Sequence, residues 1–324
     1  MVIFRTSGGK SVGFGHIKRT SFLASLIKNR NDVLFLINND KVIFDYLISK
    51  KFKVEYFDNY KIDLTKVRAL IFDLRHYSKK DIELIEKLKQ ESIPSIQITD
   101  LGLSLQQTDY LIDGGISLLN KINYDYKEKL LGPDYVILHS RFRHFNKVKR
   151  KYSKRGKQAL VSLGGASDYR KLRDLIDIVY RYGFKIKVAA GFYIKKNQKK
   201  VLRRIYSGLK FVGKTDSLAR ALFEADISFI SSGITAYESA SVGTPSVYIY
   251  YNEEQKFIAE NLEKHGVGIS ATSLKELYKK RIIEIIKNMN YEKRMKMGLK
   301  GKELIDGLGV YRIIEFFYKI SIIN

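Results

Sequence analysis

His16 is the residue of this sequence whose type and position best suit chemistry near neutral pH. It follows an apolar run, Val2–Phe4, and a segment with four glycines in eight residues, Gly8 to Gly15. Glycine permits positive φ angles and a close approach of the backbone to a ligand, and imidazole titrates in the range that a general base requires. A helix predicted to begin near His16 would point its free N–H groups into this loop. The pattern favours an anion-binding loop with a catalytic base at its rim, although a surface turn with a helix-capping histidine would have the same composition.

Two later loops repeat the order of strand, small residues and helix. The segment Val161–Asp168 contains Gly164 and Gly165, and Ser231–Glu238 leads from a buried strand into a predicted helix. Both loops suit a phosphate group at a helix N-terminus. Glu238 lies near the start of its helix, where a carboxylate can accept hydrogen bonds from both hydroxyls of a ribose. The helix dipole alone would also favour a glutamate there.

The remaining polar residues narrow the choice of site. His76 follows the predicted strand Ala69–Phe72 and is the second candidate for a catalytic histidine, and Asn252–Gln255 follows a later strand. The first loop lacks the spacing G-x-G-x-x-G, and no acidic residue ends the second predicted strand, which argues against NAD. The sequence has no cysteine and no His, Asp and Glu cluster with metal-ligand spacing. We therefore expect no cofactor and no protein-bound metal.

Short apolar runs alternate with amphipathic stretches of helical length along the chain, which predicts βαβ units and parallel sheets. The predicted strands are Val2–Phe4, Val33–Leu36, Ala69–Phe72, Ser95–Ile98 and Val136–Leu138, then Ala159–Ser162, Lys185–Ala189, Leu209–Val212, Ile227–Ile230 and Ser246–Tyr250. The predicted helices are Ile17–Lys28, Val42–Lys50, Lys80–Gln90, Arg170–Arg181, Ser217–Glu224, Ala236–Val242, Gln255–Lys264, Leu274–Lys287, Tyr291–Ile305 and Val310–Ile322.

The alternation pauses at a basic run, Lys147–Lys157, and then starts again. Such a pause predicts an α/β protein of two doubly wound, Rossmann-like domains that face each other across a cleft. We expect domains at residues 1–148 and 149–308, with the helix in 309–324 packing back toward the N-terminal domain. Ligands of such sheets bind at the carboxyl ends of the strands.

The composition bounds the function classes. Hydrophobic residues make up 45% and charged residues 29% of the 324 residues, which is typical of a globular protein. The formal net charge of +25 attracts nucleic acid, anionic membranes and anionic substrates alike, but no recognisable nucleic-acid module accompanies it. The N-terminus does not resemble a signal peptide, and no window approaches the roughly 20 apolar residues of a membrane span. We expect a cytoplasmic protein without a specific nucleic-acid partner and with weak association to anionic membrane.

With these residues in view, the sequence resembles the PseG/SpsG family. Phe4-Arg5-Thr6 with Val12 to Arg19 looks like the family's arginine-bearing first strand and its G-x-G-H-x-x-R motif. Leu131–Leu138 with Phe142 is similar to the stretch before the family's domain linker, and Ser162–Gly165 to its second glycine turn. Ser232–Glu238, Gly243-Thr244-Pro245 and Gln255 look like the nucleotide-binding stretch shared with MurG-type glycosyltransferases.

The resemblance implies a GT-B fold and a UDP-sugar hydrolase of pseudaminic acid-type polysaccharide biosynthesis. Its reaction releases UDP by attack at the anomeric carbon with inversion. His16 would activate water, the N-terminal domain would hold the sugar or acceptor, and the C-terminal domain would bind UDP. Glu238 would hold the ribose, and Gln255 the sugar or phosphate. The other implied substrate-binding residues are Arg5, Gly13, Gly15, Arg19, Asp73, Tyr77, Gly164, Gly165, Ser232, Gly233 and Thr235.

Some positions depart from the family pattern. Ser7 stands where an acidic residue is usual, Glu254 precedes Gln255 where an asparagine is usual, and Asp100 is a single acid where the family has two. These positions are expected at the sugar, so the sugar stays open. A GT-B glycosyltransferase with a sugar or lipid acceptor is the alternative, since its base would act on a hydroxyl instead of water. A non-catalytic nucleotide-sugar sensor or a nucleic-acid binder is a further alternative.

Overall fold

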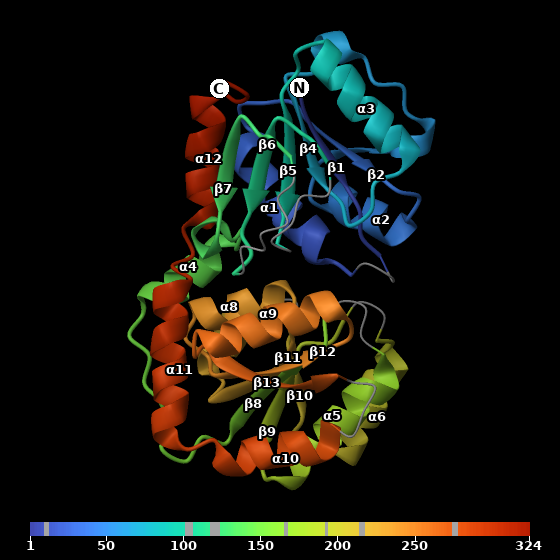
Figure 1. Ribbon diagram of the computed structural model, residues 1–324. Helices are drawn as coiled ribbons and strands as arrows, with labels where there is room; N and C mark the ends of the chain where they lie inside the picture. Colours follow the sequence, from blue (N-terminus) through green and yellow to red (C-terminus); the bar gives the residue numbers. More distant parts are fainter. Residues whose placement is uncertain are drawn as a thin grey trace. The chain divides into compact units, whose positions relative to one another are not determined.

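The chain divides into two compact units, each built on its own parallel sheet. The computed structural model describes residues 1–9, 13–100, 106–116, 124–164, 168–191, 194–213, 218–273 and 278–324. Unit 1 comprises Met1–His139 with Leu308–Asn324, and unit 2 comprises Ser140–Gly307 (Figure 1).

The first boundary between the units lies between His139 and Ser140, before the basic run, whereas the sequence predicted it at residues 148 and 149. The helix α4 (Ser140–Lys147) belongs to unit 2, although the sequence placed these residues in the N-terminal domain. The Asn146 amide donates to the carbonyl oxygens of Ser241, Lys302 and Ile305, all of unit 2. These hydrogen bonds join segments that are distant in sequence, so the local sequence pattern could not indicate them.

The described part of unit 1 contains a seven-stranded sheet in the order β3-β2-β1-β4-β5-β6-β7, with parallel pairings throughout. This order has the doubly wound form, because the chain starts in the middle and builds outward in both directions. The strands are β1 (Val2–Thr6), β2 (Val33–Ile37), β3 (Lys53–Tyr56), β4 (Ala69–Asp73), β5 (Ser95–Thr99), β6 (Tyr110–Asp113) and β7 (Glu128–Leu131). The helices are α1 (Gly15–Ile27), α2 (Lys41–Ser49), α3 (Lys79–Gln90) and α12 (Gly309–Lys319), with short 3₁₀ turns at Phe57–Asn59, Leu64–Lys66 and Pro133–Tyr135.

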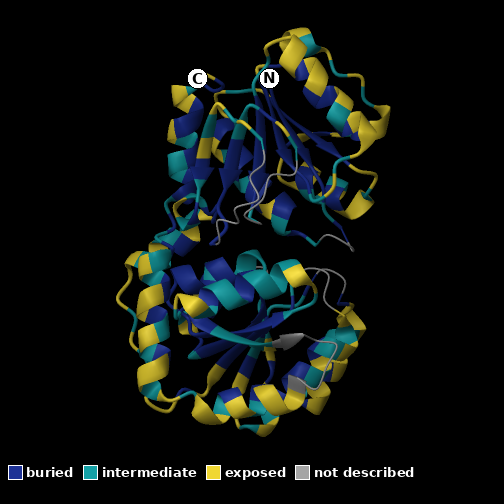
Figure 2. Cartoon of the chain, in the orientation of Figure 1, coloured by how far each residue is buried: buried dark blue, intermediate teal, exposed yellow. Residues whose placement is uncertain are grey.

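Both faces of this sheet are covered, which explains its continuous apolar strands. On one face, α3 packs Leu84, Ile85 and Leu88 against β1, β2 and β4. The helix α12 is bound to the far edge, where Phe316 meets Tyr110 of β6 edge to face and Lys319 pairs with Glu128 of β7. Figure 2 shows the strands dark and the outer helix faces exposed.

The described part of unit 2 contains a six-stranded parallel sheet in the order β10-β9-β8-β11-β12-β13. The strands are β8 (Gln158–Ser162), β9 (Lys185–Val188), β10 (Lys210–Phe211), β11 (Ile227–Ser231), β12 (Ser246–Tyr250) and β13 (Gly268–Ser273). The helices are α5 (Tyr169–Arg181), α6 (Lys196–Ile205), α7 (Leu218–Glu224), α8 (Ile234–Ser241), α9 (Glu253–Lys264), α10 (Tyr278–Asn288) and α11 (Tyr291–Leu304).

The apolar core of unit 2 joins α5, α6 and α10 to one face of the sheet. On the other face, three buried serines connect β11, α8 and β12: Ser228, Ser239 and Ser246 lie 2.8–3.1 Å apart through their hydroxyl groups. The helix α11 packs on α8 through glycines, and a Cβ at Gly301 would lie 2.8 Å from the Ala240 carbonyl oxygen. Small residues therefore bring α8 close to both the sheet and α11.

The α/β class with two doubly wound sheets is confirmed, and most predicted elements lie where the sequence put them. The predicted strand Val136–Leu138 is wrong, because these residues form a buried irregular segment after a 3₁₀ turn, and Gly309 of α12 packs against it. A short apolar run does not distinguish a strand from another buried segment. The sequence interpretation missed β3, β6, β7, β13, α4 and α6. No helix in the described ranges is long and apolar enough to span a membrane.

Gly298 is predicted to be essential for the packing of α11. A Cβ at this position would overlap the Tyr152 hydroxyl and the Gly243 carbonyl oxygen. We expect Gly298→Ala to lower the free energy of unfolding by about 1–3 kcal/mol, since overpacking outweighs the gain in helix propensity. Chemical denaturation followed by circular dichroism measures this. Leu299→Ala, at a 56% exposed position of the same helix, should change it by less than about 0.5 kcal/mol. Equal effects would contradict the packing argument.

Candidate active site

A buried histidine–aspartate pair lies at the carboxyl edge of the unit 1 sheet. His16 is the second residue of α1, and Asp73 is the last residue of β4, aligned with Thr6 at the end of β1. The His16 Nδ1 atom lies 2.5 Å from Asp73 Oδ1. Asp73 is fully buried and His16 is 8% exposed. The pair occupies the strand ends at which doubly wound sheets bind ligands.

The charge of Asp73 determines where His16 carries its proton. Burial by itself would raise the pKa of Asp73, but the Arg19 guanidinium and the His16 imidazole outweigh burial and hold this pKa far below its usual 3.8. An ionised Asp73 has no proton to donate, so His16 Nδ1–H must be the donor in the 2.5 Å bond. When the imidazole is neutral, a proton on Nδ1 leaves the lone pair on Nε2, the form that serves as a general base.

Arg19 pairs with two carboxylates, those of Asp73 and Asp100. It donates from Nε to Asp73 Oδ2 at 2.7 Å and from an Nη to Asp73 Oδ1 at 2.6 Å. Its other Nη lies 3.0 Å from Asp100 Oδ2, just after β5. Burial would lower the pKa of Arg19, but the carboxylates of Asp100 and Asp73 raise it beyond its usual value. A fork-shaped bidentate pair also fixes the orientation of Asp73, and through it the imidazole.

Arg5 points to the opposite face of the same strands and binds Asp81 of α3. Its Nε donates to Asp81 Oδ1 at 2.7 Å, and its guanidinium carbon lies 4.0 Å from the centre of the Phe57 ring. Asp81 also accepts from the backbone N–H and the hydroxyl of Ser78, which caps α3. Arg5, which the sequence assigned to the substrate, is thus bonded to the protein and ties α3 to β1.

Three buried polar atoms near these strand ends have no hydrogen-bond partner among the described residues: Thr6 Oγ1, Tyr77 Oη and Gln97 Nε2. Burial raises the pKa of Tyr77 well above its usual value, and the Asp73 and Asp81 carboxylates raise it further. Unpaired buried polar atoms are costly, so each calls for an explanation, and a polar ligand that meets the atom is one. Tyr77 was predicted from the sequence as a substrate-binding residue, whereas Thr6 and Gln97 were not.

The glycine loop before α1 closes on itself. Gly9 and Gly13 exchange backbone hydrogen bonds of 3.0 and 2.7 Å, and Gly13 has a φ of 85° with open space where a Cβ would lie. Gly15 is the first residue of α1, whose N-terminus has no side-chain cap and no acidic residue in its first turn. The first turn of α1 therefore carries no acidic side chain of its own, and its first N–H groups suit an anion.

In unit 2, the predicted residues cluster at the start of α8. Gly233 is the N-cap of α8, contributes no capping side chain and has open space where a Cβ would lie. The Ser232 hydroxyl donates to the Gln255 carbonyl at 2.7 Å, and Gln255 Oε1 accepts from the Tyr251 N–H at 3.0 Å. These bonds join the start of α8 to the start of α9.

The other predicted residues of unit 2 lie at the same sheet edge. Gly164 follows β8 with a φ of 82°, and a Cβ there would be 3.2 Å from Ser231 Oγ. Thr235 and Glu238 lie on the first turns of α8 and are half-buried. Gly165 lies outside the described residues. A helix N-terminus with nearby glycine and a carboxylate one turn on can hold a phosphate and a diol together.

The structure thus brings Arg5, His16, Arg19, Asp73 and Tyr77 to one sheet edge in unit 1. Sequence reasoning did not foresee the pairing of Asp81 with Arg5, although the capping pattern Ser78-x-x-Asp81 was readable. Asp100 was noted at its strand end, but its bond to Arg19 was not predicted. His76, the second candidate histidine, is exposed. Within the described ranges no group of three His, Cys, Asp or Glu side chains could hold a metal ion.

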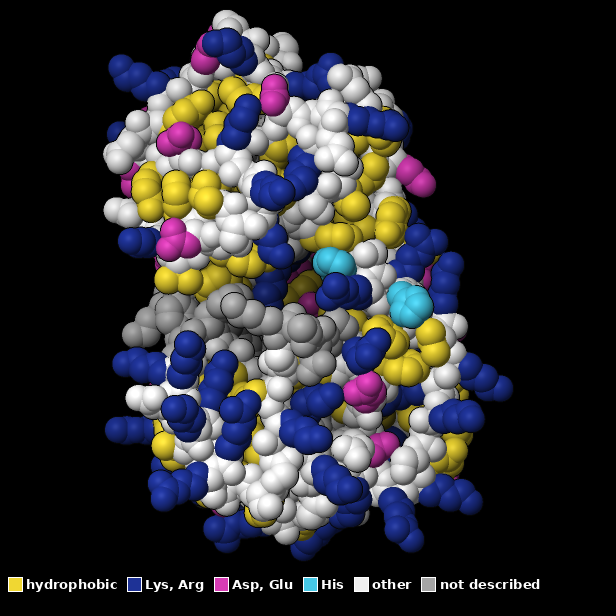
Figure 3. All heavy atoms as spheres, turned by 180° about the vertical axis from the view of Figure 1, so that it is seen from behind, with side chains coloured by type: hydrophobic (Ala, Val, Ile, Leu, Met, Phe, Trp, Pro, Cys, Tyr) yellow, Lys and Arg dark blue, Asp and Glu magenta, His cyan; other side chains and the backbone are white. Residues whose placement is uncertain are grey.

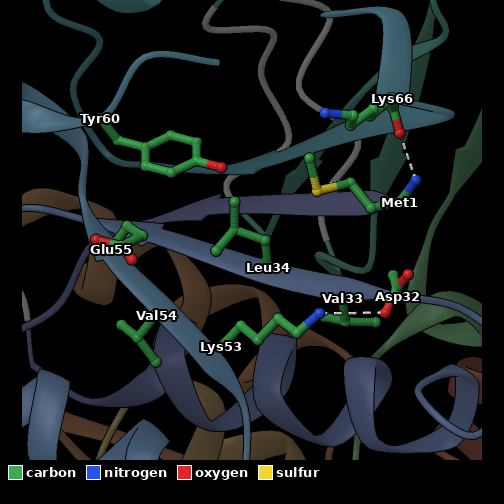
Figure 4. A pocket seen from close by; sticks show the side chains of 9 residues that line it. All are labelled: Met1, Asp32, Val33, Leu34, Lys53, Val54, Glu55, Tyr60 and Lys66. Atoms are coloured by element: carbon green, nitrogen blue, oxygen red, sulfur yellow. Dashed lines mark hydrogen bonds and ion pairs between the residues drawn. The ribbon is translucent and has the colours of Figure 1, made fainter. Parts of the chain in front are cut away.

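A cavity of about 660 Å³ lies at the other end of the unit 1 strands, away from these residues. Figure 4 shows the Tyr60 ring and the Met1 side chain over Leu34, with the Lys53–Asp32 ion pair at its rim. Both members of that ion pair are about three-quarters exposed, at 74% and 76%. The cavity contains none of the predicted site residues, so its size alone does not make it the active site.

Two doubly wound sheets with glycine loops at their carboxyl ends define a protein of the GT-B class. The chain is 26% identical to the spore coat polysaccharide biosynthesis protein SpsG of Bacillus subtilis (strain 168) over 326 residues, covering 94% of each chain. The MurG structure from Acinetobacter baumannii matches 98% of this chain and 99% of its own at a TM-score of 0.69 and 12% identity. The LpCGTa structure in complex with UDP matches 97% and 99% at a TM-score of 0.62 and 12% identity. No family model matches the chain. The GT-B-like class and the resemblance to SpsG and MurG are confirmed.

The bonds of Asp73 to His16 and Arg19 should make the protein less stable in acid. Because the folded pKa of Asp73 lies below its usual 3.8, these bonds stabilise the fold above about pH 5. Each unit by which the folded pKa lies below 3.8 contributes about 1.4 kcal/mol to the free energy of unfolding. This contribution is lost as the pH falls from about 5 toward the folded pKa. Asp73→Asn should flatten the decline of the free energy of unfolding between pH 6 and 3, measured by chemical denaturation. Asp63→Asn removes an exposed carboxylate whose pKa is lowered by its hydrogen bonds to Lys66 and Thr65, and it should flatten the slope less than Asp73→Asn. An unchanged slope for Asp73→Asn would contradict this assignment.

Proposed function

We propose that the protein is a UDP-sugar hydrolase of surface polysaccharide biosynthesis. The observation that carries the proposal is the buried His16–Asp73 pair of 2.5 Å at the carboxyl edge of the unit 1 sheet. It is supported by the similarity to a polysaccharide biosynthesis protein over 94% of the chain, and by a UDP complex among proteins of the same fold.

In this proposal, His16 Nε2 takes a proton from water as the water oxygen attacks the anomeric carbon. The bond from that carbon to the UDP oxygen breaks, UDP leaves with the electron pair, and the configuration at the carbon inverts. Asp73 holds the imidazole in the required tautomer and stabilises the imidazolium that forms. Arg19 keeps Asp73 ionised and in place, so it acts by positioning the base.

Unit 2 would bind the nucleotide. The N-terminus of α8 at Gly233 presents backbone N–H groups to the diphosphate, and its dipole opposes the charge that grows on UDP as the bond breaks. Glu238 would accept from the ribose hydroxyls. Gln255, whose carbonyl and Oε1 are bonded within the protein, would present its amide nitrogen to the sugar or phosphate.

In unit 1, the buried polar atoms of Thr6, Tyr77 and Gln97 would meet polar groups of the sugar, and Gly13 and Gly15 would admit it. A pseudaminic acid-type precursor, a diacetamido-trideoxy-hexose, is the sugar that the sequence resemblance favours. Ser7 and Glu254 depart from the family's residues at positions expected near the sugar.

A GT-B glycosyltransferase is the second candidate, because a histidine base acts on an acceptor hydroxyl as it does on water. Incubation with a panel of UDP-sugars and no acceptor separates the two. Free sugar and UDP in equal amounts support the hydrolase, whereas release of UDP only after addition of a sugar or lipid acceptor supports the transferase. Mass spectrometry of the products identifies the sugar in the same experiment.

His16→Gln is predicted to lower kcat by about 10²- to 10⁴-fold with little change in UDP affinity, because it removes the base and leaves unit 2 intact. Turnover of the UDP-sugar identified in the panel and calorimetric titration with UDP measure the two quantities. His76→Gln is the matched control, at an exposed position near the end of the neighbouring strand, and should keep wild-type turnover. Full activity in His16→Gln would remove this residue from catalysis.

Glu238→Gln is predicted to weaken UDP binding by about 1–3 kcal/mol, because a ribose hydroxyl loses a charged acceptor. Isothermal titration with UDP and with 2′-deoxy-UDP checks the contact, and the variant should bind the two nucleotides with more similar affinity than the wild type. Glu253→Gln is the control of equal charge change, because the Glu253 side chain at the start of α9 is 90% exposed. The contact is refuted if both variants bind UDP as the wild type does.

A further inference from the structure

One stretch of unit 2 concentrates positive charge. Between Asp177 and Asp216 the sequence contains eleven Lys and Arg residues and no Asp or Glu. This stretch includes β9, α6 and β10 at one edge of the sheet. Figure 3 shows Lys and Arg side chains gathered on the face of unit 2 that it draws, with few Asp and Glu among them.

The helix α6 presents this charge outward. Leu202 is fully buried and fixes the orientation of the helix, whereas Lys196, Lys200 and Arg204 are exposed at intervals of four residues and therefore share one face. No carboxylate of the described residues lies within ion-pair distance of these three side chains. Their charge is therefore available to a partner.

Two aliphatic side chains accompany the charges. Val201 is 45% exposed and Ile205 is 54% exposed, again four residues apart, so they form an apolar strip beside Lys200 and Arg204. On the other side of the helix, Lys199 and Arg203 lie over Phe211 of β10, at 5.7 and 5.1 Å from its ring centre. The exposed surface of α6 thus combines a cationic row with an apolar row.

We propose that α6 docks the protein on the surface of an anionic lipid bilayer. The Lys196, Lys200 and Arg204 row binds lipid phosphates, and Val201 and Ile205 enter the interfacial layer, as in interfacial amphipathic helices. A nucleic acid would satisfy the charges but would offer the aliphatic pair no comparable gain, because backbone phosphates dominate that kind of binding. The apolar row therefore favours the bilayer.

The helix α3 of unit 1 does not have this composition. On α3 of unit 1, the exposed Lys87 and Lys89 alternate with Glu83, Glu86 and Glu91 at its end. Mixed charges of this kind make a solvated surface with little net attraction for an anionic layer. The charge of a helix therefore does not by itself produce a surface like that of α6, and exposed lysines of unit 1 provide a control of equal charge change.

The test is co-sedimentation of the full chain with vesicles of phosphatidylcholine alone or mixed with phosphatidylglycerol. We expect binding to the mixed vesicles only. The triple variant Lys196→Gln, Lys200→Gln, Arg204→Gln should lower the partition coefficient by about 10- to 100-fold. The double variant Val201→Ser, Ile205→Ser should lower it by about tenfold, and this part of the loss should persist at high salt. Thermal denaturation confirms that each variant is folded.

The control triple variant, Lys87→Gln, Lys89→Gln and Lys129→Gln, removes the same charge from exposed positions of unit 1 and should leave vesicle binding within about twofold of wild type. Equal losses in the α6 and control variants would overturn the proposal, since net charge alone would then explain the binding. An α6 double variant with unchanged partitioning would overturn the apolar contact. Absence of binding to the mixed vesicles, or salt-dependent binding of RNA in its place, would overturn the bilayer as the partner.

Discussion

The burial of an ionised Asp73 is the constraint on which the unit 1 site depends. A carboxylate that is removed from water is costly unless charged partners and hydrogen bonds surround it. Arg19 supplies two of these bonds and His16 supplies the third. Because Nδ1 of His16 is bonded to Asp73, only Nε2 is available to a substrate. The hydrogen bond that stabilises the buried charge therefore also orients the imidazole as a base. The ring position and its tautomer therefore follow from one local balance of charges.

The parallel sheet makes this cluster possible. Asp73 is separated from His16 by 57 residues of sequence, yet β1 and β4 are neighbours, so both chain segments leave the sheet at the same edge. The next strand, β5, delivers Asp100 to the same guanidinium. Opposite it, Arg5 and Asp81 form a second buried pair that ties α3 to the sheet. Strand ends are thus tied together by side chains whose charges cancel within the core.

Unit 2 uses the same architecture with different chemistry. Its sheet edge carries glycines, serines and an uncapped helix start at Gly233 in place of buried ion pairs. Backbone N–H groups at a helix start attract anions without a formal charge, and a half-buried Glu238 adds a hydrogen-bond acceptor. The dense positive charge of this unit lies on the outside, along α6, where lysine and arginine remain hydrated. One unit therefore suits proton transfer and the other suits a phosphate ligand.

The sequence by itself determined the α/β class, the central strands of both sheets and the loops with glycine and histidine. These features are local, because the periodicity of apolar residues and the clustering of glycines are visible in short stretches of sequence. It also indicated His16, through its place in a glycine loop after a predicted strand, and Asp73 and Tyr77, through the resemblance to the PseG/SpsG family. Tertiary structure alone decided that Arg5 and Arg19 are bonded inside the protein, because their partners Asp81, Asp73 and Asp100 are distant in sequence. It also decided that Val136–Leu138 is a buried irregular segment, since an apolar run reports burial and not hydrogen-bond pairing. Composition and spacing are read along the chain, whereas charge compensation depends on which strands become neighbours.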